Sequence, residues 1–115
     1  MQRGEWRRTG RVAFLAALAA VTAGSLVPVQ ELPGPVLWDK AQHALGHGTL
    51  YLLLRAGWPA APRLRAAAGL LGYGILLEFA QAATGYRTGD VLDVLANATG
   101  IALAALLTVR RSGQR

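Results

Sequence analysis

Long apolar stretches constrain the fold of this chain most. Four runs rich in Leu, Ala, Val and Gly are separated by short clusters of arginines, prolines and other polar residues. Each run is close to the roughly 20 residues that an α-helix needs to cross the hydrocarbon core of a bilayer. The sequence therefore predicts an all-α integral membrane protein, with one domain over residues 1–115 and four transmembrane helices.

Prolines and charged residues mark the expected ends of these helices. Residues 28–40 hold three of the five prolines and are expected to form an extended loop outside the cytoplasm. Trp38 and Trp58 bracket the second helix at a spacing that fits the two membrane interfaces. The predicted order is a basic leader over 1–11, transmembrane helices over 12–27, 38–58, 64–83 and 90–109, and a basic tail over 110–115.

The first apolar run has a second interpretation. A basic leader, an apolar core and small residues at Ala23 and Ser25 are also typical of a cleaved signal peptide. Cleavage would leave three spans and a new N-terminus outside the cell. Retention is favoured, because Trp6 suits the inner interface and Pro28 ends a span that begins near it.

Composition excludes several classes of function. The chain has no cysteine, which excludes disulfides, thiolate metal sites and cysteine nucleophiles. The net charge of +6 comes from arginines at the ends of apolar runs, where they anchor helices and set topology. Binding of nucleic acid is therefore not expected.

The distribution of charge predicts an orientation. One end of a four-span arrangement would carry ten of the twelve Lys and Arg residues, and the other end only Lys40 and Arg87. Five of the six acidic residues fall on the end with few cations, leaving Glu5 at the other. By the positive-inside rule, both termini are expected in the cytoplasm of a bacterial cell, with the acidic end of the bundle outside.

Polar residues gather at this outer level in three separate segments. From Asp90 the residues Asp93, Asn97 and Gly100 recur at helical spacing and form one stripe, which Ala104 continues. An ionisable residue within a membrane costs at least about 2.5 to 3.5 kcal/mol, so such residues face the bundle interior and pair. We therefore expect a polar site open to the outside, with these ligand-binding residues: Asp39, Lys40, His43, Glu78, Gln81, Arg87, Asp90, Asp93 and Asn97.

The order of these residues resembles the VanZ-like family of small bacterial membrane proteins. The resemblance is carried by Asp39, Lys40 and His43, by Glu78 and Gln81, and by Arg87, Asp90, Asp93, Asn97 and Gly100. It covers roughly residues 36–107 and does not include the first helix. It implies a four-helix membrane protein of the cell envelope and a link to resistance against the glycopeptide teicoplanin, but no settled reaction.

Two positions depart from the family pattern. His47 stands where the family often has an aromatic residue, one turn beyond the histidine of the motif. Ala104 stands where a glycine is common, although alanine also permits close helix contact. Six glycines are expected to let helices approach closely, namely Gly46, Gly48, Gly69, Gly72, Gly74 and Gly100.

Structural roles compete with functional ones at several positions. Asp90 and Asp93 can cap a helix or complement its dipole. Lys40 can extend to the outer interface, and Arg87 can form an ion pair that joins two helices. Glu78 lies inside its span and must be either protonated or paired with His43 or Arg87.

Metal binding is a weak alternative for this cluster. His47 follows His43 by one helical turn and, with Glu78 and Asp93, would supply imidazole and carboxylate ligands. That spacing recurs by chance, so we expect neither a metal nor another cofactor.

Three classes of function remain open. The first is a non-catalytic envelope protein that binds a lipid headgroup, a cell-wall precursor or a glycopeptide, with membrane lipids around it. The second is an intramembrane enzyme with Glu78 or His43 as general base on a lipid-linked substrate. The third is a small subunit of a membrane complex, and a homo-oligomer is also left open.

Overall fold

The chain folds into a bundle of four α-helices. The computed structural model describes residues 2–26, 36–85 and 90–113, and all regular structure in these ranges is helical. The all-α prediction with four helices is confirmed. The helices are α1 (Arg3–Ser25), α2 (Val36–Gly57), α3 (Arg63–Thr84) and α4 (Val91–Gly113).

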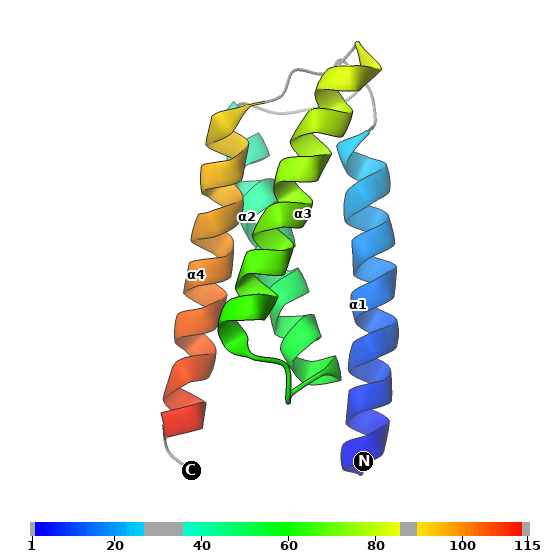
Figure 1. Cartoon of the computed structure of the whole chain (residues 1–115), viewed down its shortest axis with the longest axis vertical. Helices are drawn as coiled ribbons and strands as arrows, with labels where there is room; N and C mark the ends of the chain where they lie inside the picture. The colour runs from blue at the N-terminus through cyan, green and yellow to red at the C-terminus, as the bar shows by residue number, and fades with distance from the viewer. Residues whose placement is uncertain (1, 27–35, 86–89, 114–115) are drawn as a thin grey trace.

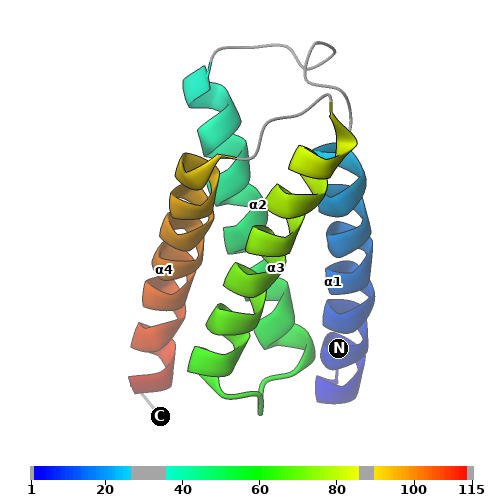
Figure 2. The ribbon, with the colours of Figure 1, turned by 45° about the horizontal axis from the view of Figure 1, so that its top comes forward.

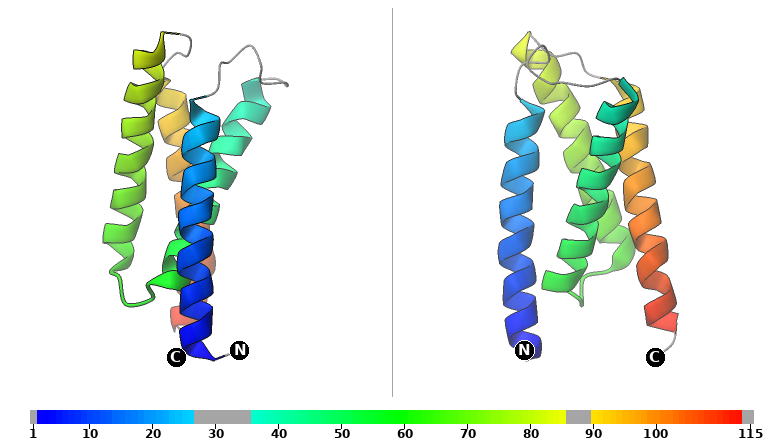
Figure 3. Two further views of the ribbon diagram at one scale, coloured as in Figure 1. Left: turned by 90° about the vertical axis from the view of Figure 1, so that its right-hand side faces the viewer. Right: turned by 180° about the vertical axis from the view of Figure 1, so that it is seen from behind.

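The helices run alternately up and down. α1 begins and α4 ends at the same end of the bundle, where the turn between α2 and α3 also lies (Figure 1). Seen from behind, α2 lies between α1 and α4 and packs against both (Figure 3). α3 crosses the opposite face, where it contacts α2 and α4 more extensively than α1 (Figure 2). α2 is therefore the central helix of the bundle.

Two helices extend beyond the predicted spans at the basic end of the bundle. α1 begins at Arg3 rather than at residue 12, so the predicted leader forms its first turns. α4 continues to Gly113 and takes up most of the predicted tail. The physical reason is that arginine is a good helix former, so a change from apolar to basic composition does not interrupt a helix.

The remaining boundaries agree more closely. α2 begins at Val36, so the last five residues of the predicted loop 28–40 are helical, and residues 27–35 lie outside the described residues. α3 begins directly after Pro62, which cannot continue a helix from α2. It ends at Gly85, whose φ of 79° is the left-handed conformation that favours glycine at a helix end.

Two of the four helices are long and apolar enough to cross a membrane. They are α3, over Arg63–Thr84, and the Val91–Val109 part of α4. The first nine residues of α1 hold four arginines and Glu5, and α2 contains Asp39, Lys40 and Arg55. Length and composition therefore support two membrane-spanning helices, and the spanning role of α1 and α2 stays a prediction.

The bundle is apolar outside and partly polar inside. Side chains with large exposed apolar surface include Leu45 on α2, Phe79 on α3 and Leu107 on α4. Soluble domains bury such residues and leave charged ones in water. The polar side chains that are buried here are His47, Glu78, Gln81, Asp93 and Asn97.

Glycines bring α2 and α4 very close together. A Cβ on Gly100 would overlap the carbonyl group of Ala44, and one on Gly48 would lie 3.0 Å from the carbonyl oxygen of Gly100. The predicted role of glycine in close packing is confirmed at these positions. It is wrong for Gly69 and Gly72, around which a Cβ would meet no atom within 4 Å.

Arginines at the basic end bond to backbone carbonyl groups. Arg11 Nε donates to the Gly57 carbonyl at 2.9 Å, and its guanidinium lies 5.3 Å from the ring centre of Trp58. Phe14 packs edge-on against the same indole, with ring centres 5.6 Å apart. Arg63 donates to the Ala105 carbonyl at 2.5 Å. Trp58 and these arginines therefore join helices as well as marking one end of the bundle.

Candidate functional site

The polar residues of three helices meet at the end of the bundle opposite the chain termini. α2 and α4 begin at this end and α3 ends there (Figure 1). The predicted meeting of the three segments at one level is therefore found in the structure. Arg87 lies outside the described residues. The predicted site residues that the structure does describe are Asp39, Lys40, His43, Glu78, Gln81, Asp90, Asp93 and Asn97.

Lys40 joins α2 to α4 through two aspartates. Its Nζ lies 2.7 Å from Asp90 Oδ2 and also donates to Asp93 Oδ1. Asp39 on its own helix is a looser partner, 3.6 Å away. The close packing of α2 on α4 brings this ammonium within reach of both carboxylates. Lys40 is thus an interhelical cation.

Asp90 has two roles at the start of α4. Its Oδ1 accepts the backbone N–H of Leu92 at 2.8 Å, which confirms the predicted helix cap. Its Oδ2 accepts from Lys40, and that charged hydrogen bond lowers the pKa of the Asp90 carboxyl below its ordinary value of 3.8. Asp93, one turn further, is buried and binds side chains instead of capping the helix.

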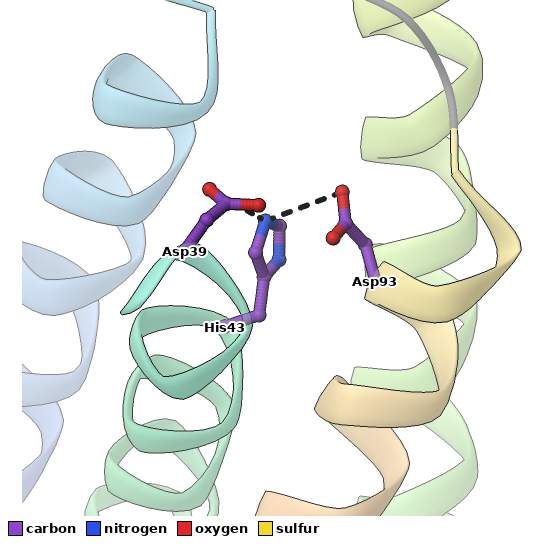
Figure 4. A group of neighbouring side chains, drawn as sticks. All are labelled: Asp39, His43 and Asp93. Atoms are coloured by element: carbon purple, nitrogen blue, oxygen red, sulfur yellow. Dashed lines mark ion pairs between the residues drawn. The ribbon is translucent and has the colours of Figure 1, made fainter. Parts of the chain in front are cut away.

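His43 lies between two carboxylates (Figure 4). Its Nε2 is 3.4 Å from Asp93 Oδ2 and 3.9 Å from Asp39 Oδ1. Its Nδ1 is 3.2 Å from the side-chain amide of Asn97. The imidazole can therefore form ion pairs when it is protonated, and when it is neutral it keeps the contact with Asn97.

Asn97 connects the two histidines of α2. With its amide nitrogen facing α2, Asn97 lies 3.2 Å from His43 Nδ1 and 3.1 Å from His47 Nδ1. His47 is almost fully buried, and its Nε2 has no hydrogen-bond partner among the described residues. A Cβ on Gly74 would come within 2.9 Å of that nitrogen. Gly74 of α3 therefore leaves the space that the His47 ring needs.

Glu78 and Gln81 connect α3 to its neighbours through the backbone. Glu78 Oε2 accepts the N–H of Asp90 at 2.7 Å, and Gln81 Nε2 donates to the Ser25 carbonyl at the end of α1 at 2.7 Å. The expected ion pair of Glu78 with His43 is not formed within the described ranges. The second oxygens of both side chains, Oε1 in each case, are buried without a described partner.

The cluster could hold a cation, although with other ligands than the sequence suggested. Asp39, His43 and Asp93 offer one ligand atom each within 4.8 Å of one another. His47 and Glu78 do not belong to this group, because Nε2 of His47 faces Gly74 and Oε2 of Glu78 binds the backbone. Lys40 already neutralises Asp93, so a metal ion would compete with this ammonium.

A cavity lies beside the cluster, and the part of its wall that α1 forms was not predicted from the sequence. It has a volume of about 280 Å³ and lies between α1 and α2. Asp39 and His43 form its polar wall, and α1 contributes Val21, Gly24 and Ser25. These α1 residues are small or apolar and give no sequence signal of a binding site, so only their packing against α2 identifies them.

Comparison with known proteins adds no identification to this geometry. No family model, curated protein or solved structure matches the chain.

Proposed function

We propose that this chain is a multi-pass protein of the bacterial cytoplasmic membrane, with four spans and both termini in the cytoplasm. A helix of 22 residues, such as α2, is about 33 Å long, which suffices for a hydrocarbon core of about 30 Å. The apolar outer surface supports this placement, because lipid solvates it without cost. The excess of arginine at the end that holds the termini supports the orientation.

Within this arrangement the polar end of the bundle faces the outside and acts as a ligand-binding site. The observation that carries this proposal is the presence of buried polar atoms without described partners, at Glu78 Oε1, Gln81 Oε1 and His47 Nε2. An unpaired buried polar atom costs about 1 to 3 kcal/mol. A fourth such atom, the hydroxyl oxygen of Tyr51, lies one turn further along α2. The other three belong to the polar cluster, so a water or ligand that entered the cluster would supply the partners they lack.

The ligand is an amphiphile of the cell envelope, such as a lipid headgroup, a cell-wall precursor or a glycopeptide. The resemblance to VanZ-like proteins supports the last of these, and we propose that the protein lowers susceptibility to teicoplanin. Lys40 is poorly suited to binding a phosphate group, because Asp90 and Asp93 already hold its ammonium. The carboxylates are better placed to orient amines and hydroxyls.

A second proposal is catalysis with His43 as general base. The Nε2 of His43 lies 3.4 Å from a carboxylate oxygen of Asp93, an arrangement that can orient an imidazole. Glu78 is a weaker candidate, because one of its oxygens accepts a backbone hydrogen bond. The hydroxyls of Thr84 and Thr99 donate to carbonyls of their own helices, so neither is prepared as a nucleophile.

Susceptibility to teicoplanin tests the proposed function. Bacteria expressing the wild type would be compared with bacteria expressing Glu78→Gln or His43→Ala, with membrane levels measured in parallel. Glu5→Gln is the matched control, since it makes the same chemical change at an exposed position at the other end of the bundle. We expect the wild type and Glu5→Gln to protect, and Glu78→Gln to protect less at an equal membrane level.

The pattern of loss separates binding from catalysis. A binding site should lose protection partially at several positions, whereas an enzyme should lose it completely with His43→Ala. Equal protection by all variants would show that the cluster only packs helices. If bacteria with and without the wild-type protein were equally susceptible to teicoplanin, the proposed role in teicoplanin resistance would be wrong.

A further inference from the structure

The cavity between α1 and α2 has one charged wall and one apolar wall. On the α2 side it is lined by Asp39 and His43, and on the α1 side by Val21 and Gly24, with Ser25 as the polar residue of that side. Its volume of about 280 Å³ suits a small headgroup and excludes a folded partner. Because both helices also present apolar surface to the outside of the bundle, a ligand with one polar end and an apolar body fits these surroundings.

Among the described residues, Asp39 is the aspartate of the cluster with the longest contacts to its partners. Asp90 and Asp93 take the hydrogen bonds of Lys40, whereas Asp39 lies 3.6 Å from the same ammonium and 3.9 Å from His43. The Asp39 side chain is 37% exposed, against 6% for Asp93. Asp39 is thus the acid that lines the cavity and can change partners without uncovering a buried charge.

The described part of the cluster has more acids than cations. Lys40 is the only Lys or Arg residue that the described ion pairs contain, and it serves Asp39, Asp90 and Asp93 together. A ligand that brings a positive charge would relieve this excess, and a ligand that brings only a negative charge would increase it. The ion pairs among the described residues therefore favour a cation beside Asp39.

We infer that the cavity binds the primary ammonium group of an amphiphile, with the Asp39 carboxylate as its main acceptor. A primary ammonium carries three N–H donors, so it can bind Asp39 and still reach a second acceptor on the same wall. A quaternary ammonium has the same charge but no N–H donor. This inference rests on the proposed function, because it requires the polar end of the bundle to meet a ligand of the envelope.

Retention of lipids by the purified protein tests the inference. The full chain would be reconstituted in bilayer discs that hold equal amounts of phosphatidylethanolamine and phosphatidylcholine, and the retained lipids would then be measured by mass spectrometry. The wild type should retain the primary amine over the quaternary one by on the order of tenfold. Asp39→Asn should lose this preference, and the matched control Glu5→Gln should keep it.

Free ethanolamine identifies the source of the ammonium group. If it fails to displace the retained lipid at an equal concentration, the amphiphile as a whole is the ligand and the inference holds. If it competes as well as the lipid does, the cavity binds a soluble amine and the assignment to an amphiphile is overturned.

Two results would overturn the inference and leave the proposed function valid. They are equal retention of both lipids by the wild type, and an unchanged preference in Asp39→Asn. In either case protection against teicoplanin would still depend on Glu78. The reverse result, a lipid preference that depends on Asp39 with no effect of any variant on susceptibility, would overturn the proposed role in resistance alone.

Discussion

At the residue scale, Lys40 supplies the positive charge of the ion pairs between α2 and the start of α4. Its ammonium neutralises Asp93, whose side chain is only 6% exposed. Lys40→Gln would leave that carboxylate buried without its cation. We expect the free energy of unfolding to fall by about 2 kcal/mol. The reason is that the buried Asp93 carboxylate would lose the ion pair that compensates for its lost hydration. Thermal unfolding of the purified protein in detergent would measure the loss.

A double variant controls for this prediction. Asp93→Asn removes the buried charge that Lys40→Gln leaves unpaired, so the combination should be more stable than the sum of the two single changes predicts. Additive losses would show that Lys40 and Asp93 do not depend on each other.

Asp90 gives a prediction about pH. Because Lys40 lowers the pKa of the Asp90 carboxyl in the folded protein, ionised Asp90 favours folding above the ordinary pKa of 3.8. This contribution is lost as the pH falls through the lower pKa of the folded state. Acidification from pH 7 to pH 3 should therefore reduce the melting temperature of the wild type more than that of Asp90→Asn.

The matched variant keeps the other role of the residue. Asparagine at position 90 can still cap α4 as the aspartate does through Leu92, so the comparison isolates the charge. An equal fall in the melting temperatures of the two proteins between pH 7 and pH 3 would contradict the prediction.

The residues of the site were predictable on each helix separately. Asp93, Asn97 and Ala104 are all buried, as their spacing along one face predicts. The partners of Lys40 were not predictable, since side chains fifty residues apart meet only if two helices have a particular rotation. The same holds for Gln81, whose partner is a backbone carbonyl of α1.

At the scale of elements, the contact between α2 and α4 depends on glycine. Gly100→Ala would place a Cβ against the carbonyl group of Ala44, and a backbone group cannot rotate away as a side chain can. We expect a loss of about 1 to 3 kcal/mol in the free energy of unfolding, as for other overpacked interiors. Unfolding in detergent or bicelles would measure it.

Gly69 on α3 supplies the control. A Cβ there meets no atom within 4 Å, so Gly69→Ala should be neutral or stabilise the helix by up to about 1 kcal/mol. If the two substitutions had the same effect, helix propensity rather than packing would explain both.

At the scale of the whole molecule, the bundle predicts which ends share a compartment. The chain has no cysteine, so single cysteines can report exposure to a membrane-impermeant maleimide. Gln2→Cys and Ala60→Cys, at the end with the termini, should react only after cell lysis. Ala83→Cys, near the end of α3, should react in intact cells, because the positive-inside rule places this end outside.

The same experiment decides whether α1 remains in the mature protein. α1 packs on α2 through Arg11, Phe14 and Trp58, and a cleaved signal peptide would abandon these contacts. Gln2→Cys should therefore label a full-length product after lysis. A shortened product without label would establish cleavage. Labelling of Ala60→Cys in intact cells would show that the orientation is the opposite of the proposed one.

The sequence by itself determined the four helices, the polar stripe of α4 and the common level of the three polar segments. Such features depend on the length of apolar runs and on helical periodicity, which are local properties. Only the tertiary structure decided that Lys40 pairs with Asp90 and Asp93, that Gly100 meets Ala44, and that α1 closes a cavity beside Asp39. Periodicity specifies one face of one helix, whereas the rotation and crossing of neighbouring helices decide which faces meet.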